Sequence, residues 1–293
     1  MDSLNVDHPK YSSRFYRESG VAPLGGIVLA LVAGLGAALV LAPIYSALTF
    51  INPFVYINVL ATLGLGFGLT VAVQAGANWG SIRNYKVVVL VGVLSALMAE
   101  YASWVTFIFM LTERGTIILD PLAIVEVLPL IAQEGYYTLR SAPVSGTILW
   151  ILWGVEASIV FGFTILGAWG VSSVYCEESG GWTQEESDVV RVHPTDDGFI
   201  QGLLDEKYEV LSERAEVLPP TSLEALRIDL FRPRLRTAKH YLSLVRLSPK
   251  ETKDGVEAEE EVVLKHLIVP AHVADQVQAL GAKASASTSS APT

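Results

Sequence analysis

Two carboxylates, Glu100 and Glu156, lie well inside long apolar segments of the chain, and no other acidic or basic side chain is so placed. A carboxylate in the middle of a bilayer is costly unless it is protonated or has a partner. Two carboxylates at one level of a membrane can share a proton. Their residue type and placement therefore predict a proton or cation site between two membrane helices.

A structural role also explains these two residues. Each carboxyl group would then be protonated, or hydrogen-bonded to a nearby polar side chain, and would hold the helices together. The polar side chains available for such bonds are Ser95, Tyr101, Ser103 and Ser158. A third interpretation is contact with a lipid or a partner subunit, which would supply the basic residue that the apolar segments lack.

Four apolar segments position the two carboxylates, at about residues 24–48, 54–76, 87–111 and 147–171. Each has roughly the 20 residues that a helix needs to cross a hydrocarbon core of ~30 Å, and an isolated segment satisfies its backbone in lipid only as a helix. The chain of 293 residues is 51% hydrophobic and 17% charged, whereas soluble domains are about 25% charged. This composition excludes a wholly soluble, disordered or collagen-like protein and predicts a transmembrane domain over residues 21–175.

Basic residues divide unevenly between the two sides of these segments. The N-terminal segment, residues 1–20, and the loop between the second and third apolar segments lie on one side of the membrane and carry five basic residues: Lys10, Arg14, Arg17, Arg83 and Lys86. The loops on the other side carry two, Arg114 and Arg140. The excess places the N-terminus in the cytoplasm, and four crossings return the C-terminal region to the same side. Both carboxylates then lie ~15 Å below the outer ends of their helices. The layout resembles that of many bacterial membrane proteins, which implies the inner membrane.

The loop between the third and fourth segments predicts an amphipathic helix at about residues 121–134. Asp120 is a suitable N-cap and Pro121 suits the first helical position, while Gly135 suits the end of the helix. With about 14 residues it is too short to cross a bilayer. We therefore expect it on the outer leaflet or as a cap on the bundle.

Residues 176–293 hold 13 of the 20 basic and 21 of the 30 acidic residues, a net charge of −8, so this region belongs in water. We predict a linker at 176–195, a small cytoplasmic α+β domain at 196–282 and a disordered tail at 283–293. Periodicity within the domain predicts a helix, three strands and a final short helix. These elements cover residues 196–215, 224–232, 240–247, 261–269 and 270–281, with a long hairpin loop at 248–260.

Two further groups of residues suggest contacts. Small residues inside the apolar segments favour close helix packing or a homo-oligomeric interface: Gly34, Gly64, Gly66, Gly68 and Gly162. A basic cluster in the acidic domain suits anionic lipid headgroups, the chain's own acidic run at 257–261, or an acidic partner: Arg227, Arg232, Arg234, Arg236 and Lys239. This cluster is too narrow for nucleic acid, so no nucleic-acid partner is expected.

Catalytic and cofactor motifs are missing from the sequence, and one cysteine excludes a disulfide framework and a multi-cysteine zinc site. We therefore expect no enzymatic activity, no metal site and no cofactor. The leading expectation is a membrane assembly or anchoring subunit that forms a homo-oligomer or joins a complex, in contact with membrane lipids. The alternative is a proton- or cation-handling channel or transporter subunit that uses Glu100 and Glu156.

Overall fold

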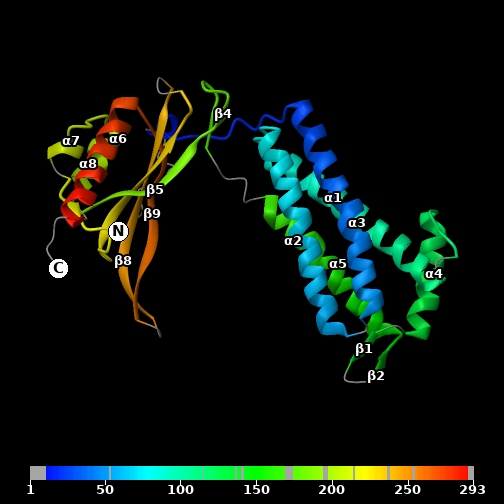
Figure 1. Cartoon of the computed structure of the whole chain (residues 1–293). Coiled ribbons are helices and arrows are strands. Elements are labelled where there is room, and N and C mark those ends of the chain that lie inside the picture. Colours follow the sequence, from blue (N-terminus) through cyan, green and yellow to red (C-terminus); the bar gives the residue numbers. More distant parts are fainter. Residues whose placement is uncertain are drawn as a thin grey trace. The chain divides into compact units, whose positions relative to one another are not determined.

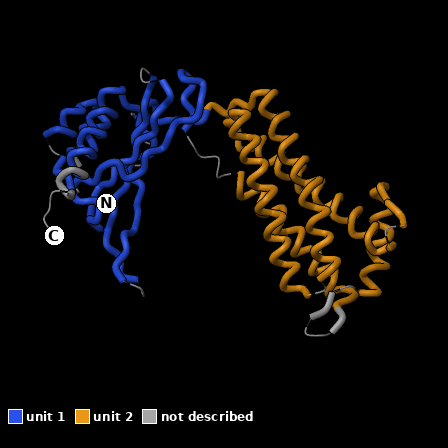
Figure 2. Tube along the Cα trace, viewed as in Figure 1, with its two compact units in different colours: residues 1–18, 173–293 blue, residues 19–172 orange. Residues whose placement is uncertain are grey.

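The computed structural model describes residues 11–52, 54–113, 115–135, 137–139, 142–168, 174–193, 197–213, 215–235, 238–252 and 255–289. The chain divides into two compact units (Figure 2). One unit, residues 19–172, contains four long apolar helices. The other combines residues 1–18 with residues 173–293 and contains a small β-sheet domain (Figure 1). A helical bundle with a small α+β domain is the fold that the sequence predicts.

The four long helices of the bundle are α1 (Leu24–Ile51), α2 (Val55–Trp79), α3 (Tyr85–Leu111) and α5 (Thr147–Gly167). All four are long and apolar enough to cross a membrane, with mean hydropathies of 1.7 to 2.6. The large side chains Leu39, Phe67 and Leu97 point outward, whereas Ala38 and Ala96 are fully buried. Large apolar residues outside and small residues inside suit helices that face lipid, so the chain has the features of a multi-pass membrane protein.

Glycines bring the four helices close together at several levels. A Cβ atom on Gly34 would overlap Ser95, and one on Gly66 or Gly68 would press on a side chain of a neighbouring helix. Gly64 and Gly162 do not pack against a neighbouring helix of this chain, because no atom lies within 4 Å of an added Cβ; for these two, a homo-oligomeric interface stays a prediction. Glycines count as packing residues only where they face a neighbouring helix, and these two face away.

Helix α4 (Pro121–Glu134) has the bounds and the caps that the sequence predicts. The Asp120 side chain accepts a hydrogen bond from the Leu122 N–H at 3.0 Å, and Gly135 ends the helix with φ +79°. Ile124 and Ile131 are buried against Phe107 and neighbouring apolar residues of α3. Helix α4 therefore covers one end of the bundle. A short hairpin, β1 (Tyr137–Leu139) and β2 (Ala142–Val144), connects it to α5.

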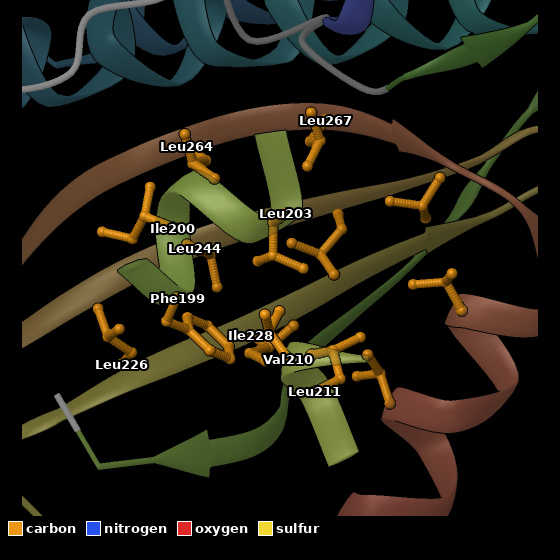
Figure 3. Packing of buried hydrophobic residues seen from close by; sticks show 14 of the residues in the cluster. Phe199, Ile200, Leu203, Val210, Leu211, Leu226, Ile228, Leu244, Leu264 and Leu267 are labelled. Carbon is orange, nitrogen blue, oxygen red and sulfur yellow. The ribbon is translucent and has the colours of Figure 1, made fainter. Parts of the chain in front are cut away.

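An antiparallel five-stranded sheet, in the order β6-β5-β7-β8-β9, forms the centre of the other unit. The strands are β5 (Gln184–Val192), β6 (Val217–Leu218), β7 (Ala225–Arg232), β8 (His240–Thr252) and β9 (Gly255–Val269), and a separate hairpin joins β3 (Tyr175–Cys176) to β4 (Gly181–Trp182). Helices α6 (Asp197–Leu204), α7 (Val210–Glu213) and α8 (Ala271–Ser289) pack on one face of the sheet. Figure 3 shows Phe199, Ile200, Leu203 and Leu211 against Ile228 and Leu244 in this core.

Strands β3, β4 and β5 lie where the sequence predicts a linker. Strand β5 begins with the polar run Gln184–Asp188, and only Val190 and Val192 are buried in it. Pairing with β6 and β7, rather than apolar alternation, makes this segment a strand. The prediction of three strands is therefore incomplete, because the sheet has two more.

The helix predicted over 196–215 is broken into α6 and α7, and residues 194–196 and 214 lie outside the described part of the chain. Helix α6 ends where Glu206 adopts φ +64° and the Lys207 N–H donates to the Gly202 carbonyl at 2.9 Å, a common form of helix termination. The turn directs Val210 and Leu211 back onto Phe199 in the core. The expected apolar face is thus correct although the helix is interrupted.

The hairpin loop predicted at 248–260 is wrong, because β8 and β9 continue as paired strands to Thr252 and Gly255. Charge pairs across the strands replace apolar contacts there. Lys250 Nζ lies 2.6 Å from the Glu259 carboxylate, and Arg246 lies 3.3 Å from that of Glu261. A strand stabilised by ion pairs lacks the apolar alternation by which a strand is recognised.

Helix α8 runs past the end predicted at Gly281 and includes residues 283–289 of the predicted tail; residues 290–293 lie outside the described part of the chain. Gly281 is buried where α8 crosses β5, and a Cβ atom there would overlap the Val189 carbonyl. This glycine therefore permits close helix-to-sheet packing instead of ending the helix.

Residues before α1 belong to the β-sheet unit instead of forming a separate segment. Phe15 pairs with Leu267 of β9, and the Tyr16 N–H donates to the His266 carbonyl at 3.0 Å. Arg14 donates to the Leu204 carbonyl at 2.8 Å and to the Tyr208 hydroxyl at 2.9 Å. The two ends of the chain, on either side of the bundle, thus meet in one unit.

Two β-bulges face each other across the middle of the sheet, and a polar side chain holds each one. The Asp229 carboxylate accepts the Asp188 N–H of the β5 bulge at 2.7 Å, and the Ser243 hydroxyl accepts the His266 N–H of the β9 bulge at 3.0 Å. Asp229 and Ser243 are themselves register partners on β7 and β8, and both are buried.

The imidazole of His266 makes the β-sheet unit sensitive to acid. It packs edge-on against Phe231, with ring centroids 4.6 Å apart, and burial together with the charge of Lys265 lowers its pKa to about 4. The unfolded chain binds a proton near pH 6.5 and the folded chain only near pH 4, so stability falls as the pH drops through this window. Because His266 is only partly shielded from water, we expect the unfolding free energy to fall by a reduced amount, on the order of 2 kcal/mol.

Urea unfolding of this unit at pH 7 and pH 4.5, followed by pulse proteolysis of the purified chain, measures this loss. Replacing His266 by glutamine should reduce the difference in unfolding free energy between the two pH values. The carboxylates and the buried His240, whose pKa burial also lowers, then supply the remainder. The same replacement at the exposed His193 is the matched control. Equal pH dependence in both variants would show that His266 is not the acid-sensitive group.

Candidate functional site in the helix bundle

The structure brings Glu100 of α3 and Glu156 of α5 to one level of the bundle. They lie 11 and 9 residues from the helix ends nearest α4, which corresponds to about 16 Å and about 14 Å. Glu156 is 5% exposed, and Glu100 is half-buried. The bundle therefore places the two carboxyl groups at a similar depth on neighbouring helices.

Tyr45 of α1 is the hydrogen-bond partner of this pair, and the sequence gives little sign of it. Its hydroxyl donates to Glu156 Oε2 at 3.3 Å and lies 3.4 Å from the Thr62 hydroxyl of α2. Tyrosine near the end of an apolar segment commonly lies at the membrane interface, which conceals its role here. Residues of α1, α2 and α5 thus meet in one hydrogen-bonded group beside Glu100.

The partners predicted for a purely structural role are engaged elsewhere. Ser95 donates to the Val91 carbonyl, Tyr101 to that of Leu119 and Ser158 to that of Gly154. The Ser103 hydroxyl is buried and has no hydrogen-bond partner among the described residues. The four polar residues near the acids therefore do not lock the carboxyl groups in place.

Several buried polar atoms of the bundle lack partners within the described part of the chain. They include Glu156 Oε1, the Ser103 hydroxyl and both polar atoms of the Asn58 side chain, and Asn58 is only 1% exposed. Each such atom costs about 1–3 kcal/mol when it is buried without a hydrogen bond. Unsatisfied groups at this density are typical of sites that hold a ligand, an ion or water.

A small cavity borders Glu100 and the Ser103 hydroxyl. Its volume is about 30 Å³, which is room for about two water molecules. Residues of α1, α3 and α5 line it: Tyr45, Ser46, Thr49, Glu100, Ser103, Trp104, Phe107 and Trp153. The cavity thus connects the hydroxyl that bonds Glu156 with the carboxylate of Glu100.

Aromatic rings pack around the cavity on the side of α4. Trp104 packs edge-on against Trp153 with ring centroids 4.8 Å apart, and against Phe107 with centroids 5.9 Å apart. Ile124 and Ile131 of α4 belong to the same apolar cluster as Phe107. Helix α4 therefore packs against the same aromatic cluster that lines the cavity.

Within the described part of the chain, no basic side chain forms a salt bridge with either acid. Helices α1, α2 and α5 contain no lysine or arginine, and α3 has only Lys86 in its first turn. Three or more metal-binding side chains do not cluster anywhere in the described part of the chain. The arrangement can exchange protons between hydroxyl and carboxyl groups, or hold a small cation that neutralises them.

The basic cluster of the β-sheet unit is largely paired within the unit. Arg227 contacts Asp229 and Glu260, the latter in the acidic run at 257–261. Cluster members Arg232 and Lys239 contact Glu186 and Glu178, at 3.3 Å in both cases. Arg234 is exposed, and Arg236 lies outside the described residues. Self-pairing therefore accounts for three of the five basic residues.

Comparison of the chain with protein-family models, curated proteins and solved structures finds no match.

Proposed function

We propose that the bundle binds and transfers protons or small cations at the polar site of Glu100, Glu156 and Tyr45. The observation that carries this proposal is a cavity lined by Glu100, Tyr45 and the unpartnered Ser103 hydroxyl, where Tyr45 bonds a Glu156 carboxyl group whose other oxygen has no partner among the described residues. Intramembrane carboxylates with neither a basic partner nor a full set of hydrogen bonds are expensive to retain for structure alone. Between the two functions expected from the sequence, the site favours the proton- or cation-handling subunit.

We further propose the bacterial inner membrane as its location, with both chain ends in the cytoplasm. An even number of four candidate spans supports two chain ends on one side of the membrane, and the pairing of Phe15 with Leu267 supports the same arrangement. Five basic residues against two support the cytoplasmic side. Protease added to intact spheroplasts is expected to spare the β-sheet unit, and its digestion there would reverse the proposed orientation.

Flux through reconstituted protein tests the proposed function. Liposomes that contain the purified chain and a pH-sensitive dye should show proton uptake under an imposed potential. Changing Glu100 or Glu156 to glutamine keeps the shape but removes the ionisable group, so uptake should fall at least about tenfold. The exposed Glu126 of α4 offers a matched control, and Glu126→Gln should leave uptake unchanged. Uptake no greater than in empty liposomes, or unaffected by both changes, would refute the proposal.

Assembly with copies or partners stays a prediction beside this function. The exposed large apolar side chains of all four long helices leave room for contacts with lipid or a second chain. Native mass measurement in a mild detergent tests it. Isolated monomers with no co-purifying protein would contradict both a homo-oligomer and a complex.

A further inference from the structure

The cavity beside Glu100 combines a carboxylate with four aromatic side chains. Tyr45, Trp104, Phe107 and Trp153 all line it. A cation is attracted to the faces of such rings, most strongly to tryptophan, and the attraction is largest where water is excluded. Rings of this kind beside a carboxylate are the chemical surroundings that bind ammonium-type cations.

The polar part of the lining suits a donor of hydrogen bonds. The Ser103 hydroxyl is buried, its residue is 6% exposed, and it has no partner among the described residues. No described residue donates a hydrogen bond to the Glu100 carboxylate. An N–H group in the cavity could donate to both oxygens. The Ser46 and Thr49 hydroxyls also line the cavity, but both donate to backbone carbonyls of the bundle. A sodium ion prefers a full shell of oxygen ligands, whereas an ammonium-type cation also gains from the aromatic part of the lining.

The size of the cavity restricts the cation. About 30 Å³ is room for about two water molecules, enough for ammonium or methylammonium, whereas the bulkier choline would have to extend through the open side of the cavity. Resting on the proposed function, we infer that this cavity is a binding site for ammonium or a small primary ammonium ion, held by Glu100, Ser103 and the rings of Trp104 and Trp153.

Binding of radiolabelled methylammonium to the full-length protein in lipid nanodiscs at pH 7 tests this inference. We expect saturable binding that ammonium chloride displaces and that choline chloride does not. Glu100→Gln should weaken binding at least about tenfold, and Trp104→Leu about tenfold, because each removes one attraction to the cation. Trp150→Leu is the matched control. The Trp150 ring packs edge-on against that of Trp153, with centroids 5.2 Å apart, but Trp150 does not line the cavity.

Trp104→Phe keeps a ring and should give intermediate affinity, which preserves the test if the leucine variant does not fold. Absence of saturable binding to the native protein would overturn the inference, as would native affinity in the Trp104→Phe variant or equal displacement by sodium chloride. Proton uptake that depends on Glu100, with no methylammonium binding, would overturn this inference and leave the proposed function standing. Methylammonium binding without any uptake would support the site while refuting transfer.

Discussion

Replacing Asp229 by alanine should lower the free energy of unfolding of the β-sheet unit by about 3 kcal/mol. The Asp229 carboxylate is 5% exposed and accepts hydrogen bonds from two sources, the Asp188 N–H and the Arg227 guanidinium. Its loss leaves the Asp188 N–H of the β5 bulge without an acceptor. It also leaves Arg227 paired only with Glu260. Unpaired buried groups cost more than the bond itself was worth.

Urea unfolding followed by pulse proteolysis of the full chain in mild detergent measures this loss. Glu257→Ala is the control, because Glu257 is an exposed acid on β9, and its removal should change stability by less than about 0.5 kcal/mol. Similar small changes in both variants would show that Asp229 does not hold the bulge. That result would mean that the apolar core on the helix-covered face of the sheet, and not the hydrogen bonds of Asp229, stabilises this region.

Replacing Gly26 by alanine should destabilise the helix bundle by about 3 kcal/mol, whereas the same change at Gly25 should stabilise it slightly. A Cβ atom on Gly26 would overlap the backbone carbonyl of Gly80 at the end of α2, and backbone cannot rotate away. At Gly25 no atom lies within 4 Å of an added Cβ. Alanine there gains about 0.5–1 kcal/mol because it loses less conformational entropy in a helix.

The two variants are compared by their thermal stability in detergent, measured as the fraction of protein that stays monodisperse after heating. The adjacent variants differ by one position in the same helical turn, so detergent and lipid effects cancel between them. Melting temperatures that shift in the same direction by the same amount would show that α1 and α2 do not meet at Gly26 and Gly80. The Gly25 variant is also a useful background for the flux and binding measurements.

Local features of the molecule follow from the sequence because they depend on neighbouring residues. The four apolar segments are recognised from length and composition, and the observed helices differ from the expected spans by a few residues at their ends. Asp120, Pro121 and Gly135 define α4 through its own caps. Alternation predicts β7 to within one residue, and the periodic face of Phe199, Leu203 and Leu211 is buried in the core.

Features that depend on distant partners were missed or wrong. Strand β5 has little apolar alternation and exists through its pairing with β6 and β7. The ion-paired half of the β8–β9 hairpin resembles a polar loop until its strands are set side by side. Gly281 resembles a helix end and instead permits contact with β5. Each case requires knowledge of a residue far away in the sequence.

The candidate site divides in the same way. By itself the sequence determined that two carboxylates lie in membrane-type helices at a similar depth, because hydropathy and a rise of 1.5 Å per residue suffice for this. Only the tertiary structure decided that Tyr45, 111 residues from Glu156, is the partner. It also decided that Ser95, Tyr101 and Ser158 bond elsewhere and that aromatic rings line the cavity. Helix rotation and packing select these neighbours, and neither is encoded in the spacing of residues along one helix.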